Sequence, residues 1–167
     1  AISGGATAAY VHGGRMDYLL ANDQLDEAAE AVAAIQEAGL PAGVAAHNPA
    51  VIEWAEENID CDFYMCCYYW PTDRSRSAEQ QAGQKEVYDD ADRDRMVELI
   101  ARLGRPAIHY KILAAGRKEP KEAFAFAARH LRPQDAVCVG IYSGDKPDML
   151  DEDLRLFLEA TAPVAAE

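Results

Sequence analysis

Three side chains that are capable of acid–base or nucleophilic chemistry accompany short apolar segments of the chain. His12 and His47 each end such a segment, and Lys111 lies within another. Histidine takes up and releases protons near neutral pH, and a lysine in apolar surroundings can act as a nucleophile or base because burial lowers the pKa of its ammonium group. We therefore take His12, His47 and Lys111 as candidate catalytic residues.

Each candidate also has a purely structural interpretation. A histidine at a strand end can simply bond to a loop carbonyl, and Lys111 could extend between helices to solvent. The occurrence of two histidines at the ends of successive segments favours a shared site. By the two-residue period of a strand, His109 and Lys111 are expected on one face.

The segments that carry these residues are typical of strands covered on both faces. They are short, rich in Val, Ile, Tyr and Ala, and not cleanly alternating. They span residues 6–12, 41–47, 62–69, 106–113 and 135–142. Between and after them, apolar residues at helical spacing predict helices over 24–38, 49–58, 92–103, 120–131 and 149–161. The alternation of strand and helix predicts a parallel sheet.

Two α/β architectures compete for this pattern, a doubly wound open sheet and a TIM (β/α)8 barrel. No G-x-G-x-x-G motif follows any segment, which weakens the open dinucleotide-binding sheet. A closed barrel needs eight strand–helix units. About five units are present in this sequence, which corresponds to part of a barrel. We predict one domain over residues 1–167, a partial barrel comprising strands four to eight, with the N-terminal strands missing. Its uncovered strand edges would favour a homo-oligomer.

The longest irregular stretch covers residues 70–91. It is polar, contains Pro71 and follows a predicted strand. A loop of this length after a barrel strand is expected on the active face, although a solvated insertion would have the same composition.

The composition of the chain argues against some classes of binding partner. The formal charge of −13 argues against nucleic acid as a partner. Neither a membrane span nor a secretory leader is visible. The adjacent Cys66 and Cys67 would face opposite sides of a strand, which suits no disulfide. We expect a cytoplasmic protein with reduced thiols, a small-molecule substrate and no metal site.

The order of five motifs resembles the second half of the aldo-keto reductase barrels. The motifs are YVHG, GVAAHNPAVIEWA, CDFYMCCYYW, HYKILAAGR and VGIYSGDKPDMLDEDL. The resemblance implies a (β/α)8 barrel, a nicotinamide cofactor, either NADP or NAD, and a small carbonyl substrate. It places His12 at the family's catalytic histidine. The chain is also similar to uncharacterised bacterial barrel proteins with H-G near strand four and K-I-L-A-A-G-R near strand seven.

The resemblance also implies where a cofactor would be held. The residues expected on the cofactor side are Asn48, Tyr69, Ser143 and Lys146, with Lys146 able to meet a phosphate. The family's Ser-Asn pair, which holds the nicotinamide amide group, falls on Ala45 and Ala46, which cannot do so. The other catalytic residues of the family would lie on strands outside this sequence.

Three functions follow from these observations. The first is an aldo-keto reductase-like oxidoreductase in which His12 orients the carbonyl. The second is a non-redox barrel enzyme: Lys111 forms a Schiff base, with His12 or His47 as its acid–base partner, or the two histidines help to hold a divalent metal. The third is a binding protein without catalysis.

Overall fold

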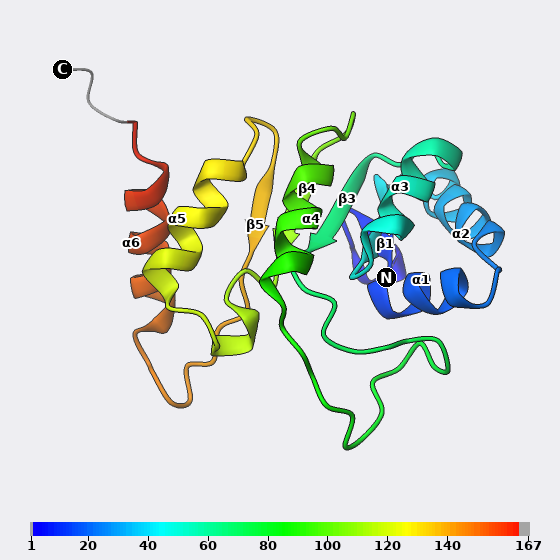
Figure 1. Ribbon diagram of the computed structural model, residues 1–167. Coiled ribbons are helices and arrows are strands. Elements are labelled where there is room, and N and C mark those ends of the chain that lie inside the picture. The colour runs from blue at the N-terminus through cyan, green and yellow to red at the C-terminus, as the bar shows by residue number, and fades with distance from the viewer. Residues whose placement is uncertain (1, 164–167) are drawn as a thin grey trace.

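The computed structural model describes residues 2–163, in which five parallel strands alternate with helices (Figure 1). The sheet order is β1-β2-β3-β4-β5, and each strand pairs in parallel with the next. The strands are Ala9–Val11, Ala42–Ala46, Phe63–Cys67, Ala107–Tyr110 and Ala136–Cys138. The α-helices α1 to α6 are Gly13–Ala21, Asp26–Glu37, Pro49–Asn58, Asp90–Ile100, Pro120–His130 and Met149–Thr161, and short 3-10 turns cover Ile2–Gly4 and Ala114–Gly116. The predicted fold class is confirmed.

Local sequence signals explain where several helices begin. The side chain of Asn48 accepts a hydrogen bond from the backbone of Ala50, with Pro49 in the first turn of α3. Asp89 caps α4 in the same way through Ala91. Such caps satisfy amide groups that have no partner inside the helix. The capping residues in the sequence therefore determine where α3 and α4 begin.

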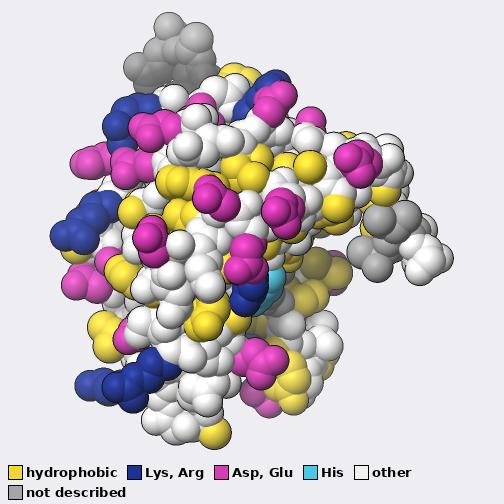
Figure 2. All heavy atoms as spheres, turned by 90° about the vertical axis from the view of Figure 1, so that its right-hand side faces the viewer, with side chains coloured by type: hydrophobic (Ala, Val, Ile, Leu, Met, Phe, Trp, Pro, Cys, Tyr) yellow, Lys and Arg dark blue, Asp and Glu magenta, His cyan; other side chains and the backbone are white. Residues whose placement is uncertain are grey.

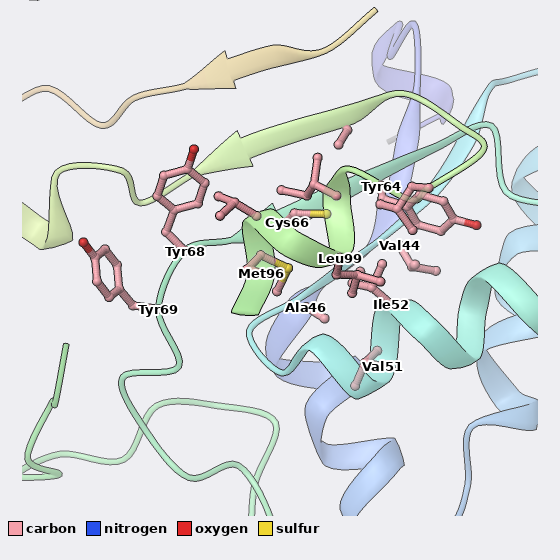
Figure 3. Packing of buried hydrophobic residues seen from close by; sticks show 14 of the residues in the cluster. Val44, Ala46, Val51, Ile52, Tyr64, Cys66, Tyr68, Tyr69, Met96 and Leu99 are labelled. Atoms are coloured by element: carbon pink, nitrogen blue, oxygen red, sulfur yellow. The ribbon is translucent and has the colours of Figure 1, made fainter. Parts of the chain in front are cut away.

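The two faces of the sheet differ in what covers them. On the helix-covered face, the side chains of Val44, Tyr64 and Cys66 are buried in one cluster with residues of α3 and α4 (Figure 3). Burial of each large apolar side chain contributes about 1.5–3 kcal/mol to stability. Tyr10 and Cys138, which belong to the alternate set of strand residues, are exposed. This second face is the one that a closed barrel would enclose.

The surface agrees with the acidic composition. In the space-filling view, acidic side chains are spread over one face, and a hollow in that face contains histidine and basic side chains (Figure 2).

Among the described residues, no helix combines the length and the apolar character needed to span a bilayer. The four cysteines are free thiols.

The structure differs from the predicted elements at the strand ends. The segments 6–12, 106–113 and 135–142 contain strands of only three or four residues, 9–11, 107–110 and 136–138. Helix α1 was not predicted. β1 and β4 end before His12 and Lys111 for local reasons: His12 caps α1, and Lys111 has a positive φ of 57°, which extended backbone does not adopt.

Candidate active site

A cleft of about 580 Å³ opens beside the carboxyl ends of the strands. Its walls come from several strands, from the start of α1 and from the connection 68–89, which contains neither helix nor strand. Figure 1 shows this connection below the sheet, on the side where the strands end. The side chains with oxygen or nitrogen atoms that line the cleft are Tyr10, His12, Arg15, His47, Arg74, Glu79, Gln80, Tyr110 and Lys111. All three candidate catalytic residues therefore line one cleft.

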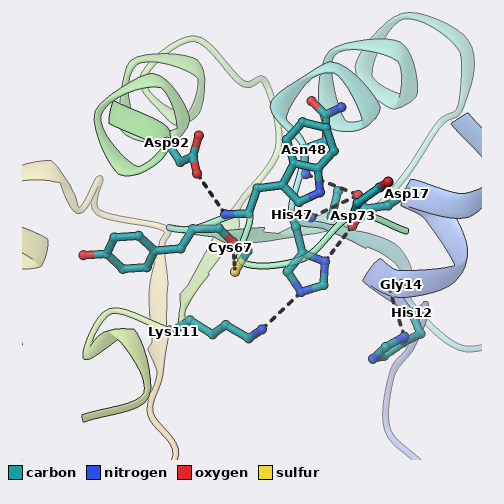
Figure 4. Close-up of polar contacts among 12 residues, drawn as sticks. His12, Gly14, Asp17, His47, Asn48, Cys67, Asp73, Asp92 and Lys111 are labelled. Carbon is teal, nitrogen blue, oxygen red and sulfur yellow. Dashed lines mark hydrogen bonds and ion pairs between the residues drawn. The ribbon is translucent and has the colours of Figure 1, made fainter. Parts of the chain in front are cut away.

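Three of the side chains near the cleft form a line of polar contacts (Figure 4). Asp17 Oδ2 lies 2.6 Å from His47 Nδ1, and His47 Nε2 lies 3.3 Å from Lys111 Nζ. The side chains of Asp17 and His47 are only 1% and 6% exposed, so their contact is screened little by water. A carboxylate that accepts a hydrogen bond from Nδ1 leaves Nε2 as the nitrogen that can accept a hydrogen bond from the lysine.

Asp17 also connects helix α1 to the residues that directly follow β2. Its Oδ1 accepts hydrogen bonds from the backbone amides of His47 and Asn48, each at 3.2 Å. The same carboxylate therefore fixes the backbone and the imidazole of His47. Close packing supports this arrangement, because a side chain on Gly13 would place a Cβ 3.1 Å from Tyr110 Oη and 3.3 Å from His47 Cε1.

Lys111 stands directly after the last residue of β4 in a strained backbone conformation. A left-handed φ in a non-glycine residue costs about 1–3 kcal/mol and persists where the surroundings enforce it, often at functional sites. The expectation that His109 shares a face with Lys111 is wrong. His109 is fully buried and contacts Tyr68 and Asp135, because the turn at Lys111 breaks the two-residue period of the strand.

His12 lines the same cleft but is not part of the polar line. Its Nδ1 accepts a hydrogen bond of 3.2 Å from the backbone of Gly14. Burial and the nearby charges of His47, Arg74 and Lys111 lower the pKa of His12. A neutral His12 ring with Nδ1 accepting presents an Nε2–H donor.

Two further groups near the cleft are poor nucleophiles. Burial raises the pKa of the Cys67 thiol to about 12, so this thiol stays protonated near neutral pH. Burial also raises the pKa of the Tyr110 hydroxyl, which donates to the carbonyl of Ala46 at 3.4 Å.

The residues expected on the cofactor side are not gathered in the cleft. Asn48 uses its side-chain oxygen to cap α3, Tyr69 is 1% exposed and packs edge-on against Tyr88, and Lys146 pairs with Glu152. Ser143 is exposed in the loop after β5. Lys146 lines a second cleft of about 630 Å³, which Lys111 also borders.

No group of three or more His, Cys, Asp and Glu side chains within residues 2–163 is placed to hold a metal ion. His12 and His47 are held instead by Gly14 and Asp17.

Sequence patterns did not point to Asp17 or Arg74. Asp17 sits between Met16 and Leu19, two buried residues of α1. An acidic residue inside an apolar helical pattern is unusual and could have drawn attention. Arg74 carries no such signal, because it lies in a polar loop.

Comparisons with known proteins support the fold. No protein-family model matches the chain, and no curated protein matches it. Among solved structures, the chain is similar to the aldo-keto reductase AKR11C1 from Bacillus halodurans in its holo form, with a TM-score of 0.50 and 14% sequence identity. The match covers 96% of this chain and 57% of that structure. The strands and helices of this chain are accordingly arranged like part of that barrel.

Proposed function

We propose that the protein acts on a small carbonyl compound and that Lys111 reacts with the carbonyl carbon to form a Schiff base. The observation that supports this proposal best is the line from Asp17 through His47 to Lys111, which gives an amine its own base. An adjacent base is a common means of activating a nucleophile. The strained backbone at Lys111 is a second support.

The proposed reaction uses only groups of this chain. His47 Nε2 takes a proton from the Lys111 ammonium, and the free amine attacks the carbonyl carbon. A C–N bond forms while the π electrons move to oxygen, which gains the proton that the nitrogen loses and becomes the hydroxyl of a carbinolamine. His47 then returns its proton to this hydroxyl, which leaves as water as the C=N bond forms. Asp17 keeps the imidazole oriented and stabilises the imidazolium that forms between these steps.

His12 has a supporting role in the same proposal. Its lowered pKa keeps the ring neutral near pH 7, and its Nε2–H can donate a hydrogen bond to the carbonyl oxygen. Such a donor stabilises the negative charge that develops on oxygen during attack.

A nicotinamide-dependent reductase is the second candidate, and the barrel likeness to a holo aldo-keto reductase supports it. The residues present do not fit that cofactor. Ala45 and Ala46 offer only methyl groups where the family has its Ser-Asn pair, and both are buried. Tyr69 is buried and Lys146 is paired. We therefore derive no step through a nicotinamide.

Reductive trapping tests the proposal. The full chain is incubated with small aldehydes and ketones, reduced with borohydride and digested for mass spectrometry. A secondary amine is expected on Lys111. Lys111→Met should abolish the adduct, whereas Lys121→Met, a change on the exposed face of α5, should leave it intact.

A second measurement separates the two candidates. NADPH and NADH are titrated against the same preparation, and fluorescence follows binding. Tight binding of either nucleotide without any adduct on Lys111 would replace the Schiff-base proposal by the reductase.

A further inference from the structure

Within residues 2–163, no carboxylate forms an ion pair with the buried guanidinium of Arg74. The residue is 7% exposed, and its Nε and Nη1 atoms are buried with no hydrogen-bond partner among the described residues. Buried guanidinium groups are normally paired, because an unpartnered buried charge is strongly destabilising. The guanidinium of Arg74 therefore keeps unused hydrogen-bond donors beside the cleft that this residue lines.

The backbone around Arg74 is held in place. Asp73 accepts hydrogen bonds from the amide and the hydroxyl of Ser75, at 2.8 and 2.9 Å. Asn22, just after α1, donates to the carbonyl of Ser75 at 3.1 Å. The hydrogen bonds between Asp73 and Ser75, and that from Asn22 to Ser75, thus hold the backbone on both sides of Arg74.

The loop also touches the first turn of α1. A side chain on Gly14 would place a Cβ only 2.3 Å from the backbone oxygen of Ala78, so glycine is required for this approach. Ala78 and Arg74 both line the cleft of His12 and Lys111. The loop therefore carries Arg74 to the same cavity as the proposed nucleophile.

The charges around this cavity favour an anion. Arg15, Arg74 and Lys111 line the cleft with His12 and His47, and among the described residues Glu79 is the only acidic one in its lining. Arg15 is partly neutralised by Glu27 at 2.6 Å. This basic lining contrasts with the net charge of −13 of the whole chain, and a hollow with histidine and basic side chains is visible in Figure 2.

We infer that Arg74 binds an oxyanion, carboxylate or phosphate, of a small ligand in this cleft. Extending this to the substrate rests on the proposed function: the substrate is then an anionic carbonyl compound whose carbonyl reaches Lys111 while its oxyanion meets Arg74. The planar guanidinium matches the two oxygens of either group.

Binding measured by calorimetry tests this inference without relying on catalysis. The probes are inorganic phosphate, pyruvate, dihydroxyacetone phosphate and the uncharged dihydroxyacetone. We expect at least one charged carbonyl compound to bind about 10-fold or more tightly than dihydroxyacetone, since charge-assisted hydrogen bonds have this strength. Comparison of pyruvate with dihydroxyacetone phosphate and phosphate identifies the preferred oxyanion.

Three variants complete the test. Arg74→Gln should weaken binding of the charged probes about 10-fold and leave that of the uncharged one unchanged, and Arg74→Lys should restore part of the affinity. Arg76→Gln is the matched control, because Arg76 is exposed in the same loop. Equal affinity of Arg74→Gln and the unaltered chain for every charged probe would overturn the inference.

Failure of the proposed function leaves a different signature. If Lys111→Met retains binding of phosphate or pyruvate that depends on Arg74, while the unaltered chain forms no borohydride adduct, the oxyanion site stands and the Schiff base does not. If adducts form equally well with charged and uncharged carbonyl compounds in the presence and absence of Arg74, the oxyanion site is refuted and the Schiff base stands.

Discussion

Asp17 decides which nitrogen of His47 is available to Lys111. The carboxylate oxygen at 2.6 Å from Nδ1 can only accept, so Nδ1 carries the proton and Nε2 is left to accept a hydrogen bond from the lysine 3.3 Å away. The other oxygen of Asp17 holds two backbone amides. One side chain thus sets both the position and the protonation of the proposed base.

The substitution Asp17→Asn should separate these two roles. The amide oxygen that it introduces can still accept from the backbone amides, but the amide nitrogen would donate to Nδ1 and place the imidazole proton on Nε2. We expect the rate of Schiff-base formation to fall by about 10²–10⁴-fold, the usual size of an acid–base contribution. Reductive trapping stopped at successive times measures this rate.

The control for this variant is Asp23→Asn, an exposed change beyond the end of α1. It should leave the trapping rate unchanged. Urea unfolding of both variants reveals any loss of folding, and a trapping rate for Asp17→Asn equal to that of the unaltered chain would remove His47 from the mechanism.

At the scale of elements, the pleat of the sheet divides its polar residues between two environments. His109 faces the helices, where Tyr68 Oη lies 3.0 Å from Nδ1 and Asp135 Oδ2 lies 3.4 Å from Nε2. Asp135 in turn binds the guanidinium of Arg132. This network joins β4 to the segments that follow β3 and precede β5, and it lies away from the cleft. We assign it to stability.

The burial of His109 predicts a pH dependence of stability. Burial lowers its pKa below the ordinary value of 6.5, so the unfolded chain binds more protons than the folded chain as the pH falls below 6.5. The free energy of unfolding should therefore decrease between about pH 7.5 and pH 5.5. His12 and His130, whose pKa values burial also lowers, contribute with the same sign.

Urea unfolding at these two pH values measures the effect, with His109→Gln as the comparison. Glutamine can still bond within the network but does not titrate, so the variant should lose less stability on acidification than the unaltered chain. An identical loss in both proteins would show that His109 does not control the response.

At the scale of the whole molecule, the sheet ends in two open edges. β1 and β5 each pair with one neighbour only among the described strands, and Tyr10 of β1 is 44% exposed. Beyond β5, α6 exposes a row of large apolar side chains at helical spacing, namely Leu150, Leu154 and Leu158. The structural match to the aldo-keto reductase covers 57% of that chain. A closed barrel has no open strand edges.

We expect the chain of 167 residues to associate with itself through these edges, because unpaired strand groups and apolar surface favour pairing. Light scattering after size exclusion should show a mass that rises with concentration. Changing Leu150, Leu154 and Leu158 to Gln should lower the association. A monomer at every concentration would contradict this prediction.

The sequence by itself determined the order of the five strands and of helices α2 to α6, and it predicted that His12 and His47 lie at the carboxyl ends of strands. Buried strands and amphipathic helices have different periods of apolar residues, and the Asn48 cap and Pro49 mark a corner without help from tertiary contacts. His47 could be predicted at the carboxyl edge because it follows the apolar segment 41–46 directly.

Only the tertiary structure decided which side chains meet. His47 is separated along the chain by 30 residues from Asp17 and by 64 residues from Lys111, and a separation in sequence gives no distance. The turn of Lys111 at φ 57° depends on what surrounds it rather than on its own preference. Arg74 reaches the cleft because Asp73, Ser75 and Asn22 hold an otherwise irregular loop against α1, and such contacts have no periodicity that a sequence could display.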